Sequence, residues 1–116
     1  MNYLGKNFLI NKLISEIGNK IDGTIILFGS FAKDEATEES DVDLFVISDK
    51  RLDMNTIRET GDLVNKEITI KPASKNQVLK GLMGNDPLIM EVFSNHIILK
   101  GIDNFCEIMW RYYAKQ

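Results

Sequence analysis

Two short groups of residues in this chain have the types and the spacing to do chemistry. Gly29 and Ser30 directly follow the apolar, β-branched run at positions 24–28, and ten further residues separate Ser30 from the pair Asp41 and Asp43. A glycine after a buried strand can adopt backbone angles that other residues avoid, and it lets a phosphate approach the chain closely. Backbone amides and the Ser30 hydroxyl can then donate hydrogen bonds to that phosphate. The first group therefore predicts a phosphate-binding turn.

The second group predicts a metal site. Asp41 and Asp43 lie two positions apart in the run D-V-D-L-F-V-I, which indicates a strand. On a strand both carboxylates project from one face, while Val42 and Leu44 enter the opposite face. Two adjacent carboxylates repel each other unless a cation lies between them. Hard oxygen ligands favour Mg2+, which usually completes its shell with waters and substrate phosphates.

Together the two groups indicate nucleotidyl transfer. That reaction needs a triphosphate held still and metal ions that offset charge on the attacking and leaving oxygens. Chance is the competing explanation, because positions 34–43 are strongly acidic and Gly-Ser is a common turn. The context favours a site, since a carboxylate inside an apolar strand is costly to bury unless it has a partner.

The elements that would position these groups alternate between helices and strands. The predicted strands lie at 24–28, 42–47, 67–71 and 97–99. The predicted helices run from Leu4 to a stop near 18–23, over about 53–65, from Ser74 to near Gly84, from Asp86-Pro87 through Phe93, and from Phe105 through Tyr113. Residues 31–40 predict a short helical turn followed by a loop. This order indicates an α/β or α+β sheet covered by helices.

Local capping signals mark three of these helices. Asp53 is the expected N-cap of the second helix, and Ser74 with Gln77 forms a capping-box signature. Asp86 is the expected cap of the helix whose first turn holds a proline.

Several large side chains are expected to face the core. Their periodic spacing assigns Phe8, Ile14 and Met54 to inward helix faces. Cys106 is expected to be a small buried hydrophobe. Trp110 and Tyr113 are interpreted as core, with a partner interface as the alternative.

The length and composition of the chain limit the kinds of protein that it can be. The chain has 116 residues, 44% of them hydrophobic, a net charge of −3 and one cysteine. These values predict a single folded domain over 1–116 and no basic surface for nucleic acid. They also exclude an intramolecular disulfide and cysteine-based metal motifs, which is typical of a cytoplasmic protein. The apolar runs are too short to span a membrane. A chain this short leaves little room for an acceptor pocket of its own.

One segment resembles a known family. L-F-G-S-F-A-K-D-E-A-T-E-E-S-D-V-D-L-F-V is similar to the signature of the polymerase-beta-type nucleotidyltransferase superfamily. More narrowly, it resembles the minimal nucleotidyltransferase (MNT) proteins of bacteria and archaea, the MntA-like antitoxins of HEPN/MNT systems. The resemblance covers residues 26–47 most fully. It implies an α+β fold with a small mixed β-sheet flanked by helices, and it implies Mg2+ and ATP.

The resemblance also implies a role for each residue of the motif. Gly29 and Ser30 would hold the triphosphate, and Lys33 would meet phosphate where the family frequently has an arginine. Asp41 and Asp43 would bind the metal.

A third carboxylate on the following strand usually completes the family's site. Glu67 is the candidate here, as a metal ligand or as the general base that activates the attacking hydroxyl. Thr69, two residues on, is the alternative occupant of that position. With Thr69 there, the metal site would be short of one ligand.

The resulting hypothesis is a Mg2+-dependent transfer of AMP from ATP to a hydroxyl. By resemblance, the acceptor is a tyrosine of a partner HEPN-domain toxin, so the chain would be an antitoxin that works in a homo- or hetero-oligomer. The first alternative is a catalytically weak binding module that neutralises its partner by covering it, using the aromatic C-terminal helix. The second is transfer to a small molecule such as an aminoglycoside, which the missing acceptor domain disfavours.

Overall fold

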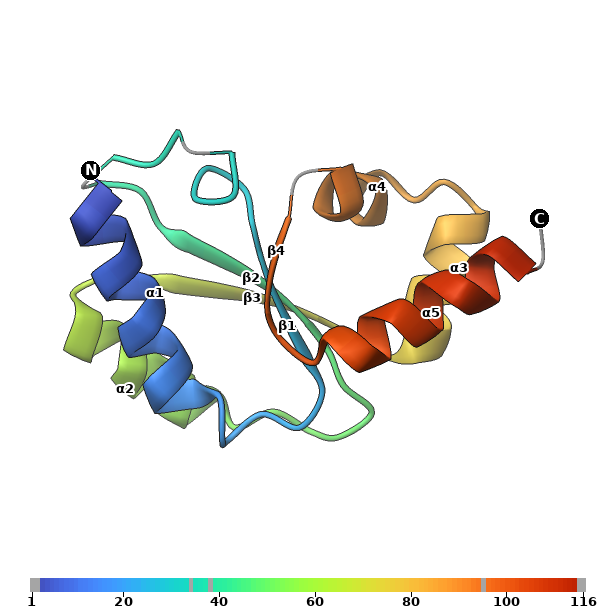
Figure 1. The fold of residues 1–116 in the computed structure, drawn as a ribbon. Helices are drawn as coiled ribbons and strands as arrows, with labels where there is room; N and C mark the ends of the chain where they lie inside the picture. The colour runs from blue at the N-terminus through green and yellow to red at the C-terminus, as the bar shows by residue number, and fades with distance from the viewer. Residues whose placement is uncertain (1–2, 34, 38, 95, 115–116) are drawn as a thin grey trace.

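The structure is a computed structural model that describes residues 3–33, 35–37, 39–94 and 96–114 (Figure 1). The helices are α1 (Tyr3–Ile17), α2 (Met54–Val64), α3 (Lys75–Met83), α4 (Pro87–Ser94) and α5 (Ile102–Ala114). The strands are β1 (Thr24–Phe28), β2 (Val42–Ile47), β3 (Ile68–Ala73) and β4 (Ile97–Lys100). The predicted order of helices and strands is therefore confirmed. No helix in the described ranges is long and apolar enough to cross a membrane.

The strands form one mixed sheet in the order β3-β2-β1-β4. β1 pairs antiparallel with both β2 and β4, whereas β2 and β3 are parallel. The registers place Asp43 between Phe28 of β1 and Thr69 of β3. The expected α+β fold with a small mixed sheet flanked by helices is confirmed.

Helices cover both faces of the sheet. α1 and α2 lie on one side, and α3, α4 and α5 lie on the other (Figure 1). The alternation along β2 supplies both cores: Val42 and Leu44 pack toward α1 and α2, and Phe45 packs toward α3, α4 and α5. Asp43 shares the parity of Phe45, so its carboxylate faces the side of the sheet that carries α4.

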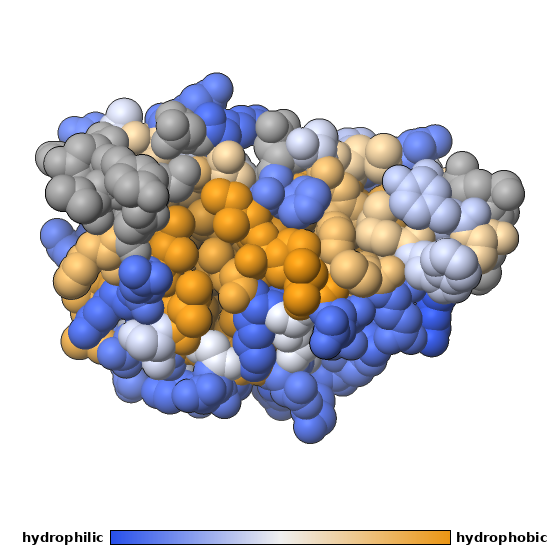
Figure 2. All heavy atoms as spheres, viewed as in Figure 1, coloured by the Kyte–Doolittle hydropathy of each residue, from blue (hydrophilic) through white to orange (hydrophobic). Residues whose placement is uncertain are grey.

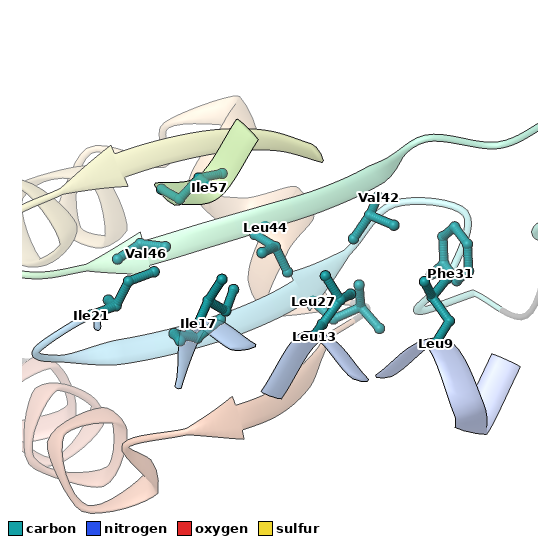
Figure 3. Close-up of a cluster of buried hydrophobic side chains, with 11 residues drawn as sticks. Leu9, Leu13, Ile17, Ile21, Leu27, Phe31, Val42, Leu44, Val46 and Ile57 are labelled. Atoms are coloured by element: carbon teal, nitrogen blue, oxygen red, sulfur yellow. The ribbon is translucent and has the colours of Figure 1, made fainter. Parts of the chain in front are cut away.

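The first core is built on one stripe of α1. Leu9, Leu13 and Ile17 recur at four-residue steps and are buried against the sheet (Figure 3). Phe8, expected to face inward, is 72% exposed, and Ile14 is exposed as well. Both lie about a quarter-turn or more from the buried stripe, because one residue of an α-helix corresponds to about 100° of rotation.

Local capping interactions fix the helix starts as predicted. The Asp53 carboxylate accepts hydrogen bonds from the backbone amides of the first turn of α2. Ser74 and Gln77 form the reciprocal capping box of α3. Asp86 Oδ1 accepts from the amides of Leu88 and Ile89 at 3.0 and 3.2 Å.

Further predictions of inward-facing side chains, on α2 and on α5, are wrong. Met54, in the first turn of α2, is exposed, while Ile57 one turn later is buried. On α5, Ile108 is buried, but Cys106, Trp110 and Tyr113 are exposed. These three residues share the face of α5 that points away from the sheet, at steps of four and three. They are not part of the core.

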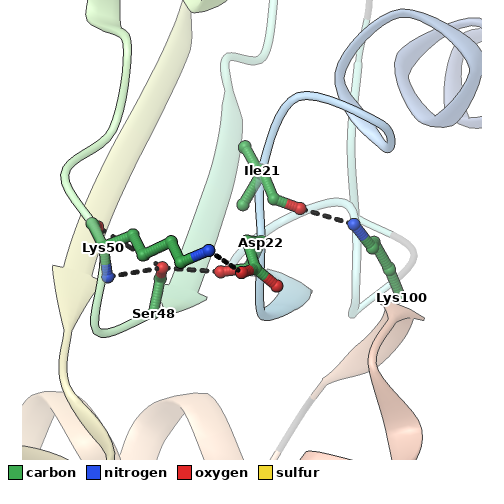
Figure 4. Close-up of polar contacts among 5 residues, drawn as sticks. All are labelled: Ile21, Asp22, Ser48, Lys50 and Lys100. Atoms are coloured by element: carbon green, nitrogen blue, oxygen red, sulfur yellow. Dashed lines mark hydrogen bonds and ion pairs between the residues drawn. The ribbon is translucent and has the colours of Figure 1, made fainter.

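A polar cluster joins the start of β1 to the end of β2 (Figure 4). Lys50 Nζ lies 2.9 Å from Asp22 Oδ2, and Ser48 Oγ donates to the Asp22 carbonyl at 2.6 Å. Lys100 Nζ donates to the carbonyls of Gly18 and Ile21. This cluster closes the end of the sheet opposite to Asp43.

An apolar region lies at the surface around β4. Figure 2 shows hydrophobic atoms gathered near the centre of the face viewed there, over β4 and the adjoining part of α1. β4 is an edge strand of the sheet, and its apolar residues Ile97, Ile98 and Leu99 are each partly exposed.

Candidate active site

The predicted phosphate-binding turn follows β1 directly. Gly29 has a φ of 73°, in the left-handed region that favours glycine. The Lys33 amide donates to the Gly29 carbonyl at 3.1 Å, and the Glu35 amide donates to the Ser30 carbonyl at 2.9 Å. Phe31 is fully buried in the core on the side of α1 and anchors the turn. Residues 29–33 thus form a hydrogen-bonded turn.

The loop after the turn leads back to the start of β2. The Thr37 amide donates to Ser40 Oγ at 2.9 Å, and the Ser40 amide donates to the Thr37 carbonyl at 3.1 Å. Lys66 Nζ donates to the same carbonyl at 3.5 Å and lies 6.0 Å from the centroid of the Phe31 ring. These contacts hold the acidic loop beside the turn, immediately before Asp41.

Gly29 and Asp43 are in direct proximity. A Cβ atom built on Gly29 would lie 2.5 Å from Asp43 Oδ2, far closer than a carbon and an oxygen can approach without a shift. Phe28 is the register partner of Asp43 on β1, which explains why the next residue meets the carboxylate. Gly29 and Asp43, one residue from each group of the predicted motif, are therefore adjacent in the structure. A glycine is required there both for its backbone angle and for its lack of a side chain.

The surroundings of Asp43 disfavour its charged form. Burial raises the pKa of the Asp43 carboxyl above its usual value, and the negative charges of Asp41 and Glu91 raise it further. Lys71, on the neighbouring strand, lowers the pKa in part. A bound cation would relieve this accumulation of negative charge.

The donor set at Asp41 and Asp43 fits Mg2+ in kind, because both side chains offer hard carboxylate oxygens. In the described ranges, no group of three or more His, Cys, Asp or Glu side chains converges to hold a metal ion. A cation held by the two aspartates would therefore take its remaining ligands from water and phosphate oxygens, as Mg2+ commonly does.

The third carboxylate position stays a prediction. The parallel register places Thr69 opposite Asp43. Glu67 lies just before β3, where its carbonyl accepts a hydrogen bond from the Val42 amide at 2.9 Å. Glu67 is exposed and lines a pocket of about 510 Å³ together with residues of α2.

Two charged residues near Asp43 were missed as site residues. Glu91 comes from α4, and its Oε1 lies 3.8 Å from Lys33 Nζ. Nothing in its spacing links it to the motif, because α4 follows much later in the chain. Lys71 shares the polar face of β3 with Thr69, and this alternation is the signal that could have identified it.

The chain is similar to known proteins in sequence and in fold. A family model described as "Nucleotidyltransferase domain" matches residues 10–99. A candidate protein adenylyltransferase of Methanocaldococcus jannaschii is 35% identical over 75 residues, an alignment that covers 51% of this chain and 74% of the relative.

Similar solved structures come from toxin–antitoxin complexes. A toxin–antitoxin crystal structure with AMP-PNP has a chain with a TM-score of 0.59 and 18% identity, covering 92% of this chain and 89% of that chain. A second is the tri-AMPylated Shewanella oneidensis HEPN toxin in complex with its MNT antitoxin, with a TM-score of 0.57, 18% identity and coverages of 96% and 89%. At these identities the likeness shows a shared fold.

Proposed function

Because this chain belongs to the nucleotidyltransferase domain family, as its match over residues 10–99 establishes, we propose that it transfers AMP from ATP to a hydroxyl with Mg2+ as cofactor. The observation that carries the proposal is the contact between the glycine turn and the metal-binding candidate. A Cβ atom at position 29 would lie only 2.5 Å from Asp43 Oδ2, so a phosphate bound to the bare glycine backbone would lie beside a cation held by Asp43.

Each residue of the site has a role in this proposal. The backbone at Gly29 and the Ser30 hydroxyl hold the triphosphate, and the Lys33 ammonium meets a phosphate oxygen as a point charge. Asp41 and Asp43 hold Mg2+. When bound, the ion offsets charge on the phosphate oxygens.

The transfer balances without any other co-reactant. The acceptor oxygen forms a bond to the α-phosphorus of ATP, and the bond from that phosphorus to the oxygen bridging to the β-phosphate breaks. Pyrophosphate leaves, and the proton of the acceptor hydroxyl passes to a carboxylate or to water. Glu67 is proposed as the third ligand or base, and with Thr69 in that position the proton acceptor would be one of the two aspartates.

We propose a protein acceptor, specifically a tyrosine of a HEPN-type toxin that this chain inactivates as an antitoxin. Three findings support this proposal: the relative named as a protein adenylyltransferase, the similar structure with AMP-PNP, and the similar complex with an AMPylated toxin. We place the reaction in the cytoplasm, where ATP is abundant and the exposed Cys106 thiol stays reduced.

Two observations favour a second candidate, a binding module that covers its partner. Trp110 is 75% exposed and Tyr113 is 65% exposed on the outer face of α5, and aromatic residues are enriched at protein interfaces. In addition, the register partner of Asp43 is Thr69 and not an acid.

Intact mass spectrometry of a HEPN-type partner incubated with this chain, ATP and Mg2+ tests the proposal. We expect the partner to gain the mass of one or more adenylyl groups with the wild type and none with Asp43→Asn. No added mass, with both proteins folded, would contradict transfer. If an Asp41→Asn, Asp43→Asn double variant still neutralised the partner, the binding module would be the better account.

A further inference from the structure

We propose that Glu91 of α4 is a positioning residue for the nucleotide, because its carboxylate holds the Lys33 ammonium in place beside the glycine turn. The inference rests on the proposed function and adds a residue to it. Neither the motif nor the usual third carboxylate includes this helix.

The geometry joins two parts of the chain that are distant in sequence. Lys33 belongs to the glycine turn, where its amide donates to the Gly29 carbonyl at 3.1 Å. Its Nζ lies 3.8 Å from Glu91 Oε1 on α4. The ion pair thus links the phosphate-binding turn to the helix on the face of the sheet that carries Asp43.

Other residues of α4 hold the helix against the sheet, and the Glu91 side chain lies outside the core. Ile89 and Val92 are buried against the sheet, and Asp86 caps the first turn. The Glu91 side chain is 51% exposed, so packing does not depend on it. A partly exposed pair of this kind adds little to stability. The ion pair instead restrains the direction in which the Lys33 side chain points.

Lys33 needs such a restraint because its four-carbon stem is flexible. An ammonium has three donors, so it can keep Glu91 while it meets a phosphate oxygen. Holding the side chain in advance lowers the entropic cost of nucleotide binding.

The test measures binding of the non-hydrolysable analogue AMP-PNP with Mg2+ by titration calorimetry, together with KM and kcat for adenylyl transfer. We expect Glu91→Gln to weaken binding and raise KM by roughly three- to fivefold, with kcat changed by less than about twofold. Lys33→Met should weaken binding by about tenfold. The Lys33→Met, Glu91→Gln double variant should bind no more weakly than Lys33→Met, because Glu91 acts through the lysine.

A matched ion pair lies away from the site. Lys75 Nζ and Glu107 Oε2 are 3.9 Å apart, with side chains 33% and 43% exposed. Lys75→Met should leave binding of AMP-PNP unchanged, which controls for the loss of a surface ion pair. Glu91→Asp, which keeps the charge, should restore part of the affinity, and thermal unfolding of each variant checks that it is folded.

The outcomes separate the two proposals. If the wild type binds AMP-PNP and Glu91→Gln binds equally well, or if the double variant is weaker than Lys33→Met by the full effect of Glu91→Gln, the positioning role is wrong and the proposed function stands. If the wild type neither binds AMP-PNP nor transfers AMP, both proposals are overturned.

Discussion

Two aspartates near opposite ends of β2 lie in opposite electrostatic surroundings. At the end of the strand, Asp22 pairs with Lys50, and the hydrogen bond and charge of Lys50 hold the pKa of the Asp22 carboxyl below its usual value. At the beginning of the strand, burial and two neighbouring carboxylates raise the pKa of Asp43. One carboxylate is stabilised in its charged form by the fold, and the other is destabilised.

This difference distinguishes a structural carboxylate from a candidate functional carboxylate in the same sheet. A charge that the folded chain compensates needs no ligand, whereas accumulated negative charge is relieved by a bound cation. The raised pKa of Asp43 is therefore one reason to expect cation binding at the start of β2, where the candidate site lies. The Asp22 end closes two turns and is expected to have no catalytic role.

The largest expected effect comes from removing the Asp43 charge. Asp43→Asn should lower kcat/KM for adenylyl transfer by about 10²-fold or more, because a candidate ligand of the metal is lost. Asp22→Asn is the matched control and should leave kcat/KM unchanged. Equal loss of activity in both variants, measured by label transfer from ATP, would show that the contrast between the two ends is wrong.

The next effect concerns the glycine that touches Asp43. Gly29→Ala should abolish detectable AMP-PNP binding and destabilise the protein by about 1–3 kcal/mol, because alanine is strained at a positive φ and its Cβ meets the carboxylate. Urea unfolding and calorimetry measure the two effects. Gly84→Ala is the control, since Gly84 has a φ of −94° and lies at the far end of α3. A Gly29→Ala protein with wild-type affinity would contradict the close approach of phosphate.

A smaller effect is a gain in stability when Asp43 is neutralised. A group whose pKa is raised on folding stabilises the protein fully only when the pH is below its unfolded pKa. This contribution to stability is lost as the pH rises through the folded pKa. Asp43→Asn should therefore have a higher Tm than the wild type at neutral pH without metal. The difference should shrink as the pH falls through the raised pKa of Asp43 and disappear below the ordinary aspartate value of 3.8. Added Mg2+ should raise the Tm of the wild type alone.

The smallest effect is expected at Asp22, where the sign is reversed. A lowered pKa contributes stability that is present above the unfolded pKa and lost as the pH falls through the folded pKa. Asp22→Asn should lower the Tm slightly at neutral pH, and the difference should vanish in acid and in high salt. A Tm difference that persisted in acid would show that the Asp22 side chain acts by packing and not by its charge.

Local signals were enough to predict much of the fold. The cap at Asp53 and the capping box at Ser74 depend on residues only a few positions apart, so the sequence reveals them. The period-2 pattern around Asp41 and Asp43 likewise predicted which side chains of β2 enter the core. The motif could be identified from the sequence because its two halves are close together in the chain, one directly after β1 and the other at the start of β2.

Features that depend on distant parts of the chain could not be predicted. Whether Glu67 or Thr69 faces Asp43 depends on the register of β3, which no local pattern specifies. Glu91 reaches the site because α4 packs on the same face of the sheet as Asp43. The exposed position of Phe8 depends in the same way on how α1 rotates against β1.

The pairing of β1 with β4 has a consequence for how the chain matures on the ribosome. β1 and its glycine turn are synthesised well before Ile97–Lys100, which supplies one of the two strands beside β1. Such long-range pairing forms slowly, and an unpaired edge of β1 would meanwhile favour aggregation. A nascent chain released before β4 would carry the whole motif without the neighbour that supports it. Nucleotide binding is therefore expected only after residues 97–100 have been synthesised and have paired with β1.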